Sequence, residues 1–288
     1  MTAVFKHELK SYFHSLSAYV FGAGLLLAVG LGALRFNLQA AVSNFEFALS
    51  YLSIIFAVIV PILTMRVIAE ERRQKTDQLL YALPITTTQI VVGKYLALLA
   101  VYMVPLGIIA LYPLMFAQFG EVYLLTSYGA MLAFFIMGAA LIALGVFISS
   151  LTDSQGFAAG MGIAVILLNY YSVSLSEYVS ATALGTVAAL CAAILALGAV
   201  IRHLTGNGNL AYGVCLVLIG ATSAVCFWDS SRLEGLLPKL MSGLFLFDRF
   251  SGFVNGMFDM TAIVYYASVI VLFLFLSVQS LEKRRYHG

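Results

Sequence analysis

Charged residues are scarce in this sequence. Only 10% of the 288 residues are Asp, Glu, Lys or Arg, whereas 62% are hydrophobic. A soluble domain of ordinary composition carries about 25% charged residues, because polar side chains must cover its surface. The formal net charge of +2 is too small to indicate a nucleic-acid partner, and no dense patch of Lys and Arg is present. The composition therefore excludes an ordinary soluble protein and a nucleic-acid-binding protein.

The sequence also lacks the motifs of nucleotide binding and catalysis. Gly93-Lys94 invites comparison with a phosphate-binding loop, but Thr88 stands where the first glycine belongs and Tyr95 follows the lysine. No HExxH, GxSxG or Cys/His cluster is present. We therefore expect no catalytic residue, no metal and no cofactor on this chain, and any ATP would be bound by another subunit.

Cysteine is rare. The three cysteines, Cys191, Cys215 and Cys226, lie inside or at the end of apolar stretches without CxxC spacing. This pattern is typical of buried small side chains rather than of a disulfide or a metal site.

Charged residues are also missing from the centre of every long apolar run. Ion-coupled transporters and intramembrane proteases need polar or ionisable groups inside the membrane. Their absence from these positions counts against both classes.

Long apolar runs dominate the sequence instead. A helix needs about 20 apolar residues to cross a hydrocarbon core, and the backbone there must satisfy its own hydrogen bonds. Eight runs meet this requirement: Leu16–Leu34, Phe47–Met65, Tyr95–Phe119, Leu124–Leu151, Phe157–Leu175, Val179–Ile201, Leu210–Trp228 and Met260–Leu281. We predict an all-α integral membrane protein, residues 1–288 forming one polytopic bundle of about eight transmembrane helices.

The distribution of Lys and Arg predicts the orientation of this bundle. With a cytoplasmic N-terminus, the inner segments hold eleven of these residues: Lys6, Lys10, Arg66, Arg72, Arg73, Lys75, Lys94, Arg202, Lys283, Arg284 and Arg285. The outer segments hold four: Arg35, Arg232, Lys239 and Arg249. Because cytoplasmic loops carry an excess of positive residues, we expect both termini in the cytoplasm.

The first 15 residues have the pattern of an amphipathic helix. Phe5, Leu9 and Phe13 recur at helical spacing, and the other side carries Lys6, His7, Lys10 and His14. Such a helix lies in the membrane surface before the chain turns inward. A frayed N-terminal tail is the alternative.

Residues 66–94 form the longest polar stretch between two predicted spans on the inner side. A short helix is predicted for Thr76–Leu83, with its leucines on one face, and Pro84 ends it. Thr86 and Gln89 are spaced as a capping box that starts the next helix. We therefore expect a short helix across the inner membrane surface.

Residues 229–259 form a second segment outside the spans, on the predicted outer side. Apolar residues recur there at helical spacing, but charges such as Arg232, Lys239 and Asp248 interrupt them. These charges would be costly at mid-bilayer. The pattern favours amphipathic helices at the outer interface over another crossing.

Three stretches resemble the ABC-2 type permeases, the membrane subunits of type V ABC transporters. The run EERRQKTDQLLYALPI at residues 70–85, followed by IVVGK at 90–94, resembles the signature of these permeases. ISSLTDSQ at 148–155 resembles the end of their fourth span. Residues 265–285 resemble the C-terminal span of the branch related to gliding-motility permeases. Members of this branch usually have six spans, so 179–201 and 210–228 would be an added pair.

The resemblance implies where a separate cytoplasmic ABC ATPase binds. The segment around residues 76–83 would be the coupling helix, and residues 1–15, with Phe5, Leu9 and Phe13, would be the elbow helix. The implied ATPase-coupling residues are Glu70, Glu71, Arg72, Arg73, Thr76, Asp77, Leu79, Leu80, Leu83 and Pro84. Two permeases, identical or related, would work with two ATPases in a prokaryotic cytoplasmic membrane. A solvated turn at residues 70–73, or packing of the leucines on lipid headgroups, is the alternative.

Three functions remain open from the sequence. The leading hypothesis is a permease subunit that couples ATP hydrolysis to transport, with export favoured by the resemblance. The second is a non-transporting anchor of an ATPase-driven mechanical or regulatory complex. The third is an intramembrane enzyme acting on lipids, for which Asp248 and Asp259 are the candidate residues.

Overall fold

The computed structural model describes residues 2–76, 85–178, 183–205, 208–228 and 245–287, and its regular elements there are all helical. Contacts divide the chain into two compact units. The first comprises Met1–Tyr170 and Leu246–Tyr286, and the second comprises Tyr171–Phe245. Residues 77–83 of the predicted coupling helix 76–83, together with residue 84, lie outside the described residues, as do residues 229–244 of the predicted outer segment.

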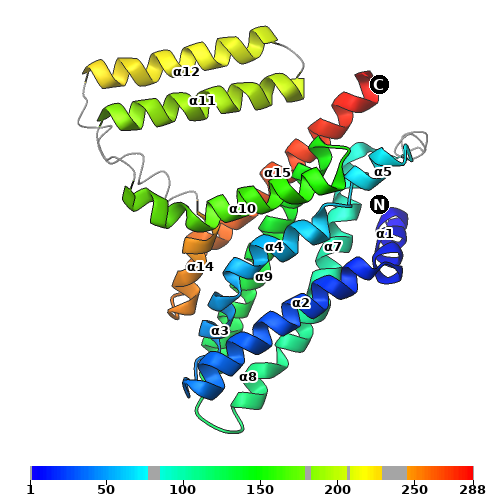
Figure 1. The fold of residues 1–288 in the computed structure, drawn as a ribbon, viewed down its shortest axis with the longest axis vertical. Coiled ribbons are helices and arrows are strands. Elements are labelled where there is room, and N and C mark those ends of the chain that lie inside the picture. Colours follow the sequence, from blue (N-terminus) through cyan, green and yellow to red (C-terminus); the bar gives the residue numbers. More distant parts are fainter. Residues whose placement is uncertain (1, 77–84, 179–182, 206–207, 229–244, 288) are drawn as a thin grey trace. The chain divides into compact units, whose positions relative to one another are not determined.

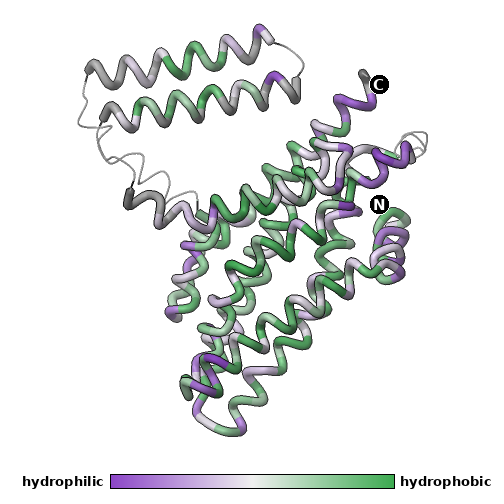
Figure 2. The backbone as a smooth tube through the Cα atoms, in the orientation of Figure 1, coloured by the Kyte–Doolittle hydropathy of each residue, from purple (hydrophilic) through white to green (hydrophobic). Residues whose placement is uncertain are grey.

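The first unit is a bundle of long helices with short helices at its ends (Figure 1). Its elements are α1 (Thr2–His14), α2 (Leu16–Ala33), η1 (Leu34–Gln39), α3 (Glu46–Tyr51), α4 (Ser53–Thr64), α5 (Ala69–Arg73), α7 (Thr87–Ile109), α8 (Leu111–Phe116), α9 (Leu124–Leu151), the start of α10 (Gln155–Tyr178), α14 (Leu246–Val254) and α15 (Met260–His287). Figure 2 shows hydrophobic residues along the long helices and hydrophilic ones gathered at α1, α5 and the end of α15.

Five helical stretches among the described residues are long and apolar enough to cross a membrane. They are Leu16–Gln39, Ser53–Arg73, Thr87–Phe116, Leu124–Leu151 and Met260–Arg285. They correspond to five of the predicted runs. The described residues of the other three predicted runs form α10, α11 (Ala183–Thr205) and α12 (Gly208–Trp228). Residues 179–182 of the sixth run lie outside the described residues, and a total of about eight crossings stays a prediction.

Helix α9 occupies the centre of the first unit. Its most apolar window is 83% buried, and it packs against α3, α4, α7 and α14. The rings of Phe56 on α4 and Phe134 on α9 lie 4.6 Å apart between centroids. Tyr102 on α7 donates a hydrogen bond from its hydroxyl to the Phe134 carbonyl oxygen, 3.0 Å away. Burial of these large side chains supplies the dispersion contacts that hold helices together in lipid.

Helices α4 and α9 approach closely at a glycine. A Cβ added at Gly145 would lie 2.7 Å from Thr64 Cβ and still closer to Thr64 Oγ1. Thr64 is buried, and its hydroxyl donates to the Val60 carbonyl oxygen at 3.1 Å. The contact exists because position 145 has no side chain, which is the usual way membrane helices pack closely.

Helix α7 begins earlier than the apolar run predicts. It starts at Thr87, and Thr86 caps it by accepting a hydrogen bond from the Gln89 N–H at 3.3 Å. The predicted N-cap is thereby confirmed. The predicted span began at Tyr95, so the polar residues just before it, including Lys94, belong to this helix.

The described part of the outer segment is the short helix α14. It buries Leu246, Phe247, Phe250, Phe253 and Val254. Its N-terminus is held by Asn169 Oδ1, which accepts from the Leu246 N–H at 3.2 Å, and by Tyr266, whose hydroxyl donates to the Leu246 carbonyl oxygen at 2.6 Å. The amphipathic pattern predicted for residues 229–259 is therefore present in this part.

The second unit contains the helical hairpin α11–α12. The two helices pack against each other, and Cys215 on α12 makes a 3.4 Å contact with the Ile194 carbonyl oxygen on α11. Cys191 and Cys215 are free thiols and half-buried, which agrees with the interpretation of these two as small packing side chains.

Candidate functional site

The candidate site is centred on Lys94 of α7, whose side chain is only 1% exposed. Its Nζ donates to Glu8 Oε1 of α1 at 2.7 Å, to Glu71 Oε1 of α5 at 2.6 Å and to the Val67 carbonyl oxygen at 3.1 Å. All three N–H groups of the ammonium therefore have an acceptor. One buried cation joins α1, α5 and α7.

The surroundings of Lys94 explain why the charge is retained there. Taking an ammonium out of water is costly unless it is paired and hydrogen-bonded. Glu8 and Glu71 are 12% and 24% exposed, so both carboxylates are mostly shielded as well. Short bonds between ionised groups are about twice as strong as neutral ones. Replacing Lys94 would remove this cation from both carboxylates, whereas replacing either glutamate would remove one of the three acceptors of the ammonium.

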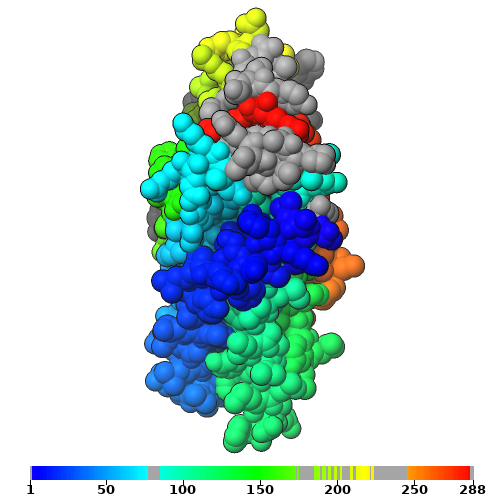
Figure 3. Space-filling model, turned by 90° about the vertical axis from the view of Figure 1, so that its right-hand side faces the viewer, coloured from blue at the N-terminus to red at the C-terminus, as the bar shows by residue number. Residues whose placement is uncertain are grey.

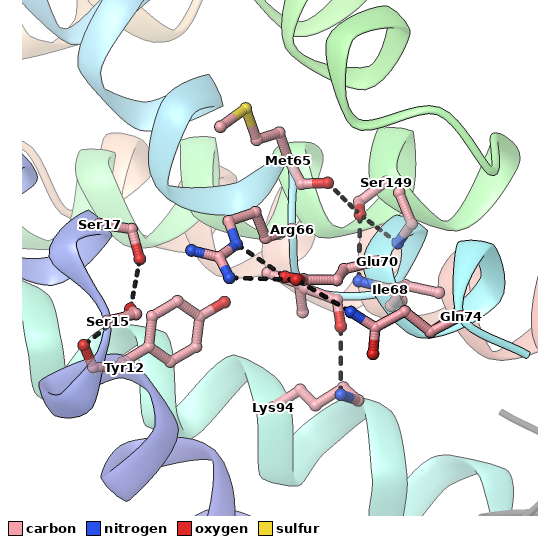
Figure 4. Close-up of polar contacts among 12 residues, drawn as sticks. Tyr12, Ser15, Ser17, Met65, Arg66, Ile68, Glu70, Gln74, Lys94 and Ser149 are labelled. Atoms are coloured by element: carbon pink, nitrogen blue, oxygen red, sulfur yellow. Dashed lines mark hydrogen bonds and ion pairs between the residues drawn. The ribbon is translucent and has the colours of Figure 1, made fainter. Parts of the chain in front are cut away.

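A second ion pair stabilises the start of α5 (Figure 4). Arg66 makes two hydrogen bonds to Glu70, Nε to Oε2 at 2.7 Å and Nη2 to Oε1 at 3.1 Å. Gln74 Nε2 donates to Glu70 Oε1 at 3.3 Å. The spacings of four residues place these side chains on one helical face.

Ser149 of α9 fills the break between α4 and α5 (Figure 4). Its Oγ accepts from the N–H groups of Ile68 and Ala69, both at 3.1 Å, and donates to the Met65 carbonyl oxygen at 3.2 Å. A helix break inside a membrane bundle leaves backbone groups that need such partners. Ser149 therefore ties the end of α9 to the start of α5.

Asp153, just after α9, lies between two arginines. Its Oδ1 is 2.8 Å from Arg284 Nη1 of α15 and 4.0 Å from Arg72 Nη1 of α5. Nearby, Ser280 of α15 donates to the Ser150 carbonyl oxygen at 2.9 Å. Helix α5 is thus joined to α1 and α7 through Lys94, and to α9 and α15 through Ser149 and Asp153.

A pocket of about 920 Å³ lies between α1 and α5. Its lining includes Glu8, Tyr12, Arg66, Glu70, Glu71 and Lys94. Burial of the Tyr12 phenol, together with the nearby Glu8 carboxylate, raises the pKa of Tyr12 well above its ordinary value, so the phenol stays neutral. The pocket brings together the N-terminal helix and the residues that precede the predicted coupling segment.

The residues predicted to contact an ATPase have different surroundings. Glu70 pairs with Arg66, Glu71 pairs with Lys94 and Arg72 is buried, whereas Arg73 is exposed. Thr76 donates from its hydroxyl to the Glu71 carbonyl oxygen at 3.3 Å. Asp77, Leu79, Leu80, Leu83 and Pro84 lie outside the described residues. An ATPase-contacting role for the whole set stays a prediction.

Helix α1 occupies residues 2–14, where the sequence predicts a helix. Leu9 packs against the core and Phe5 is half-buried, but Phe13 is 38% exposed. The most buried side chain of α1 is Tyr12. Because Glu8 is bound to Lys94, the side of α1 that carries Glu8 and Tyr12 faces the bundle.

Sequence reasoning missed Lys94, Glu8 and Ser149 as members of one site, and it missed a buried carboxylate elsewhere. Glu46, in the first turn of α3, is fully buried, and its Oε1 accepts from Ser127 Oγ of α9 at 3.1 Å. It lies one residue before the predicted second span, so the apolar run gave no signal of its burial. The Gly-Lys pair within the family signature was the only signal for Lys94.

The candidate residues for a lipid enzyme are both exposed. Asp248 lies in the first turn of α14, and Asp259 Oδ1 accepts from the Thr261 N–H at 2.8 Å at the start of α15. Hydrogen bonds from the Thr261 side chain and from its N–H lower the pKa of Asp259. An ionised Asp at a helix N-terminus is a normal capping residue.

Comparison with known families agrees with the resemblance seen in the sequence. The model of the ABC-2 family transporter proteins matches residues 33–176, a range that contains Lys94, Ser149 and Asp153 and ends before α11. No curated protein matches the chain. Membership in this family implies an ATPase partner and a membrane location. Because the match covers half of the 288 residues, the chain belongs to the ABC-2 family of transporter proteins and is a multi-pass permease subunit of an ABC transporter.

Proposed function

We propose that this permease is driven by a separate ATPase that acts on α5 and on the segment that follows it, and that it moves its substrate out of the cell. The observation that carries the proposal is the buried Lys94, which holds Glu71 of α5 and Glu8 of α1 at 2.6 and 2.7 Å. This arrangement supports a role of α5 as the element that passes a displacement to the bundle.

The position of α5 supports this transmission. It ends at Arg73, shortly before the predicted coupling segment 76–83. At its start, Ser149 bridges the backbone break after α4. A break of this kind lets one helix change its angle while the other stays packed, as in hinge and shear motions. A push on the coupling segment would then reach α1, α7, α9 and α15 through the contacts of α5.

The contact with the ATPase itself would use the leucines of the coupling segment. Leu79, Leu80 and Leu83 fall on one face of a helix, as in helix-in-groove recognition. Their face would enter a groove of the ATPase, and exposed charges such as Arg73 would lie at its rim.

The ATPase would bind on the cytoplasmic side. The end of α15 is joined to α5 through Arg284 and Asp153, and α1 is joined to α5 through Lys94. Both termini of the first unit thus lie at the α5 end (Figure 1). This agrees with the excess of Lys and Arg predicted for the cytoplasm. We further propose a pair of permeases, identical or related, with two ATPases, and a place in the branch related to gliding-motility permeases.

Replacing both Leu79 and Leu80 with Glu is expected to weaken binding of the ATPase at least roughly 30-fold. One buried hot-spot side chain at an interface contributes about 2 kcal/mol, or roughly 30-fold in affinity. The variant removes at least one such anchor if the segment binds as proposed, and it leaves an unpaired charge in the groove. Co-purification of the tagged permease with its partner ATPase measures the effect, together with stimulation of ATP hydrolysis.

Leu125→Glu is the matched control, since Leu125 is exposed in the first turn of α9, far along the chain from the coupling segment. It should leave complex formation unchanged. If the Leu79/Leu80 variant still bound and stimulated the ATPase, the coupling role would be wrong. ATP hydrolysis by an intact reconstituted complex without ATP-dependent flux of amphipathic candidate substrates would instead favour the anchor function.

A further inference from the structure

Helix α1 has two chemically distinct sides. The side facing the bundle carries Glu8, bound to Lys94, and the buried Tyr12. The opposite side carries Lys6, Lys10 and Phe13, all exposed. Figure 3 shows α1, in dark blue, lying on the surface of the molecule above α2. The helix therefore presents two cations and an aromatic ring outward.

The outward side of α1 carries no compensating negative charge. Glu8 is the only acidic residue in Thr2–His14, and it is held by Lys94. Lys6 and Lys10 form no ion pair with any residue in the part of the chain that the structure describes. They are spaced by four residues, so their ammonium groups lie on the same side of the helix.

The connection to α2 places this side at the membrane surface. Helix α1 ends at His14, and the candidate span begins at Leu16 after the single extended residue Ser15. Leu16 and Tyr19 are 77% and 59% exposed, so the exposed apolar surface that includes Phe13 continues onto the span. A cationic face beside exposed aromatic and aliphatic side chains is typical of a helix seated among lipid headgroups.

We propose that the outward side of α1 binds the headgroups of anionic phospholipids, with Lys6 and Lys10 contacting phosphate and Phe13 inserted beside the acyl chains. Each lysine near an anionic membrane surface strengthens binding by about fivefold. The two lysines together should therefore favour an anionic over a zwitterionic lipid by roughly 30-fold. The proposal does not depend on the coupling role of residues 76–83.

Lipid binding at α1 would also affect α5, because the inner side of α1 is linked to α5 through Lys94. Glu8 and Glu71 share the Lys94 ammonium, so a lipid that fixes α1 also fixes one partner of the cation that holds α5. We therefore expect anionic lipid to stabilise the α5 end of the bundle.

Binding is tested on the full chain in detergent by titration with phosphatidylglycerol or phosphatidylcholine, read by native mass spectrometry. The variant Lys6→Gln/Lys10→Gln should bind phosphatidylglycerol roughly 30-fold more weakly and bind phosphatidylcholine as the natural chain does. The matched control is Arg73→Gln/Lys75→Gln, which removes two exposed charges near the end of α5 and should keep most of the affinity. Equal melting temperatures without lipid show that both variants are folded.

Three results would overturn the proposal. The first is unchanged phosphatidylglycerol affinity in Lys6→Gln/Lys10→Gln, and the second is an equal loss in the control. The third is displacement of the lipid by glycerol 3-phosphate at the same concentration, which would identify a free phosphate ester as the ligand. Unchanged lipid binding with weaker ATPase co-purification would assign the lysines to a protein partner instead, whereas failure of the Leu79/Leu80 test alone would leave the lipid site standing.

Discussion

Replacement of Lys94 by Met is expected to lower the free energy of unfolding by about 3 kcal/mol, because it removes the cation that Glu8 and Glu71 share. Met nearly preserves the length of the side chain, so the change isolates the charge and its hydrogen bonds. The two shielded carboxylates would repel each other, and the Val67 carbonyl oxygen would lose its donor. Denaturant titration of the purified chain in detergent, followed by far-UV circular dichroism, measures the loss.

A triple variant separates this electrostatic cause from simple loss of packing. Adding Glu8→Gln and Glu71→Gln to Lys94→Met removes both carboxylate charges and should recover more than half of the lost stability. A Lys94→Met chain as stable as the natural one would contradict the account. If the proposed coupling is right, the single variant should also lose most of the stimulation of the ATPase, since α5 is no longer tied to α1 and α7.

Substituting Ala for Gly145 is expected to cost about 2 kcal/mol of stability. The new methyl group would meet the Thr64 side chain at 2.7 Å or less. Thr64 cannot rotate away freely, because its hydroxyl is bound to the Val60 carbonyl oxygen and its branched Cβ is stiff. Helices α4 and α9 would have to separate, and overpacking of this kind typically costs 1–3 kcal/mol. The melting temperature in detergent measures the effect.

Gly129→Ala on the same helix is the matched control. An added Cβ there meets nothing within 4 Å, and Ala favours a helix over Gly by up to about 1 kcal/mol. This variant should be as stable as the natural chain or more so. Equal behaviour of the two alanine variants would show that the α4–α9 contact tolerates extra volume.

The five long apolar helices could be predicted from the sequence because their signal is local. Helix α9 covers Leu124–Leu151, the same residues as its apolar run. The run contains no charged residue that could interrupt the helix. The N-cap at Thr86 was equally local. The amphipathic character of α1 followed from spacing alone, although spacing could not say that the Tyr12 side faces the bundle.

The site could not be predicted because its members are distant in sequence. Lys94 and Glu8 are 86 positions apart in the sequence. Ser149 is 81 positions from Ile68, whose N–H donates a hydrogen bond to the Ser149 Oγ. Each of these residues alone looks like an ordinary polar residue near the end of a span. The break between α4 and α5 was hidden for the same reason, because the hydroxyl that satisfies its backbone comes from another helix.

The position of α9 limits how two permeases can pair. Helix α9 is packed against α3, α4, α7 and α14, so little of its surface is exposed for contact with a second permease. The corresponding window of Met260–Arg285 is only 28% buried and that of Leu16–Gln39 only 39%. Two permeases would therefore have to pair through the less buried outer helices, such as α2 or α15. Cysteines introduced on α2 or α15 should crosslink two copies, whereas cysteines in the middle of α9 should not.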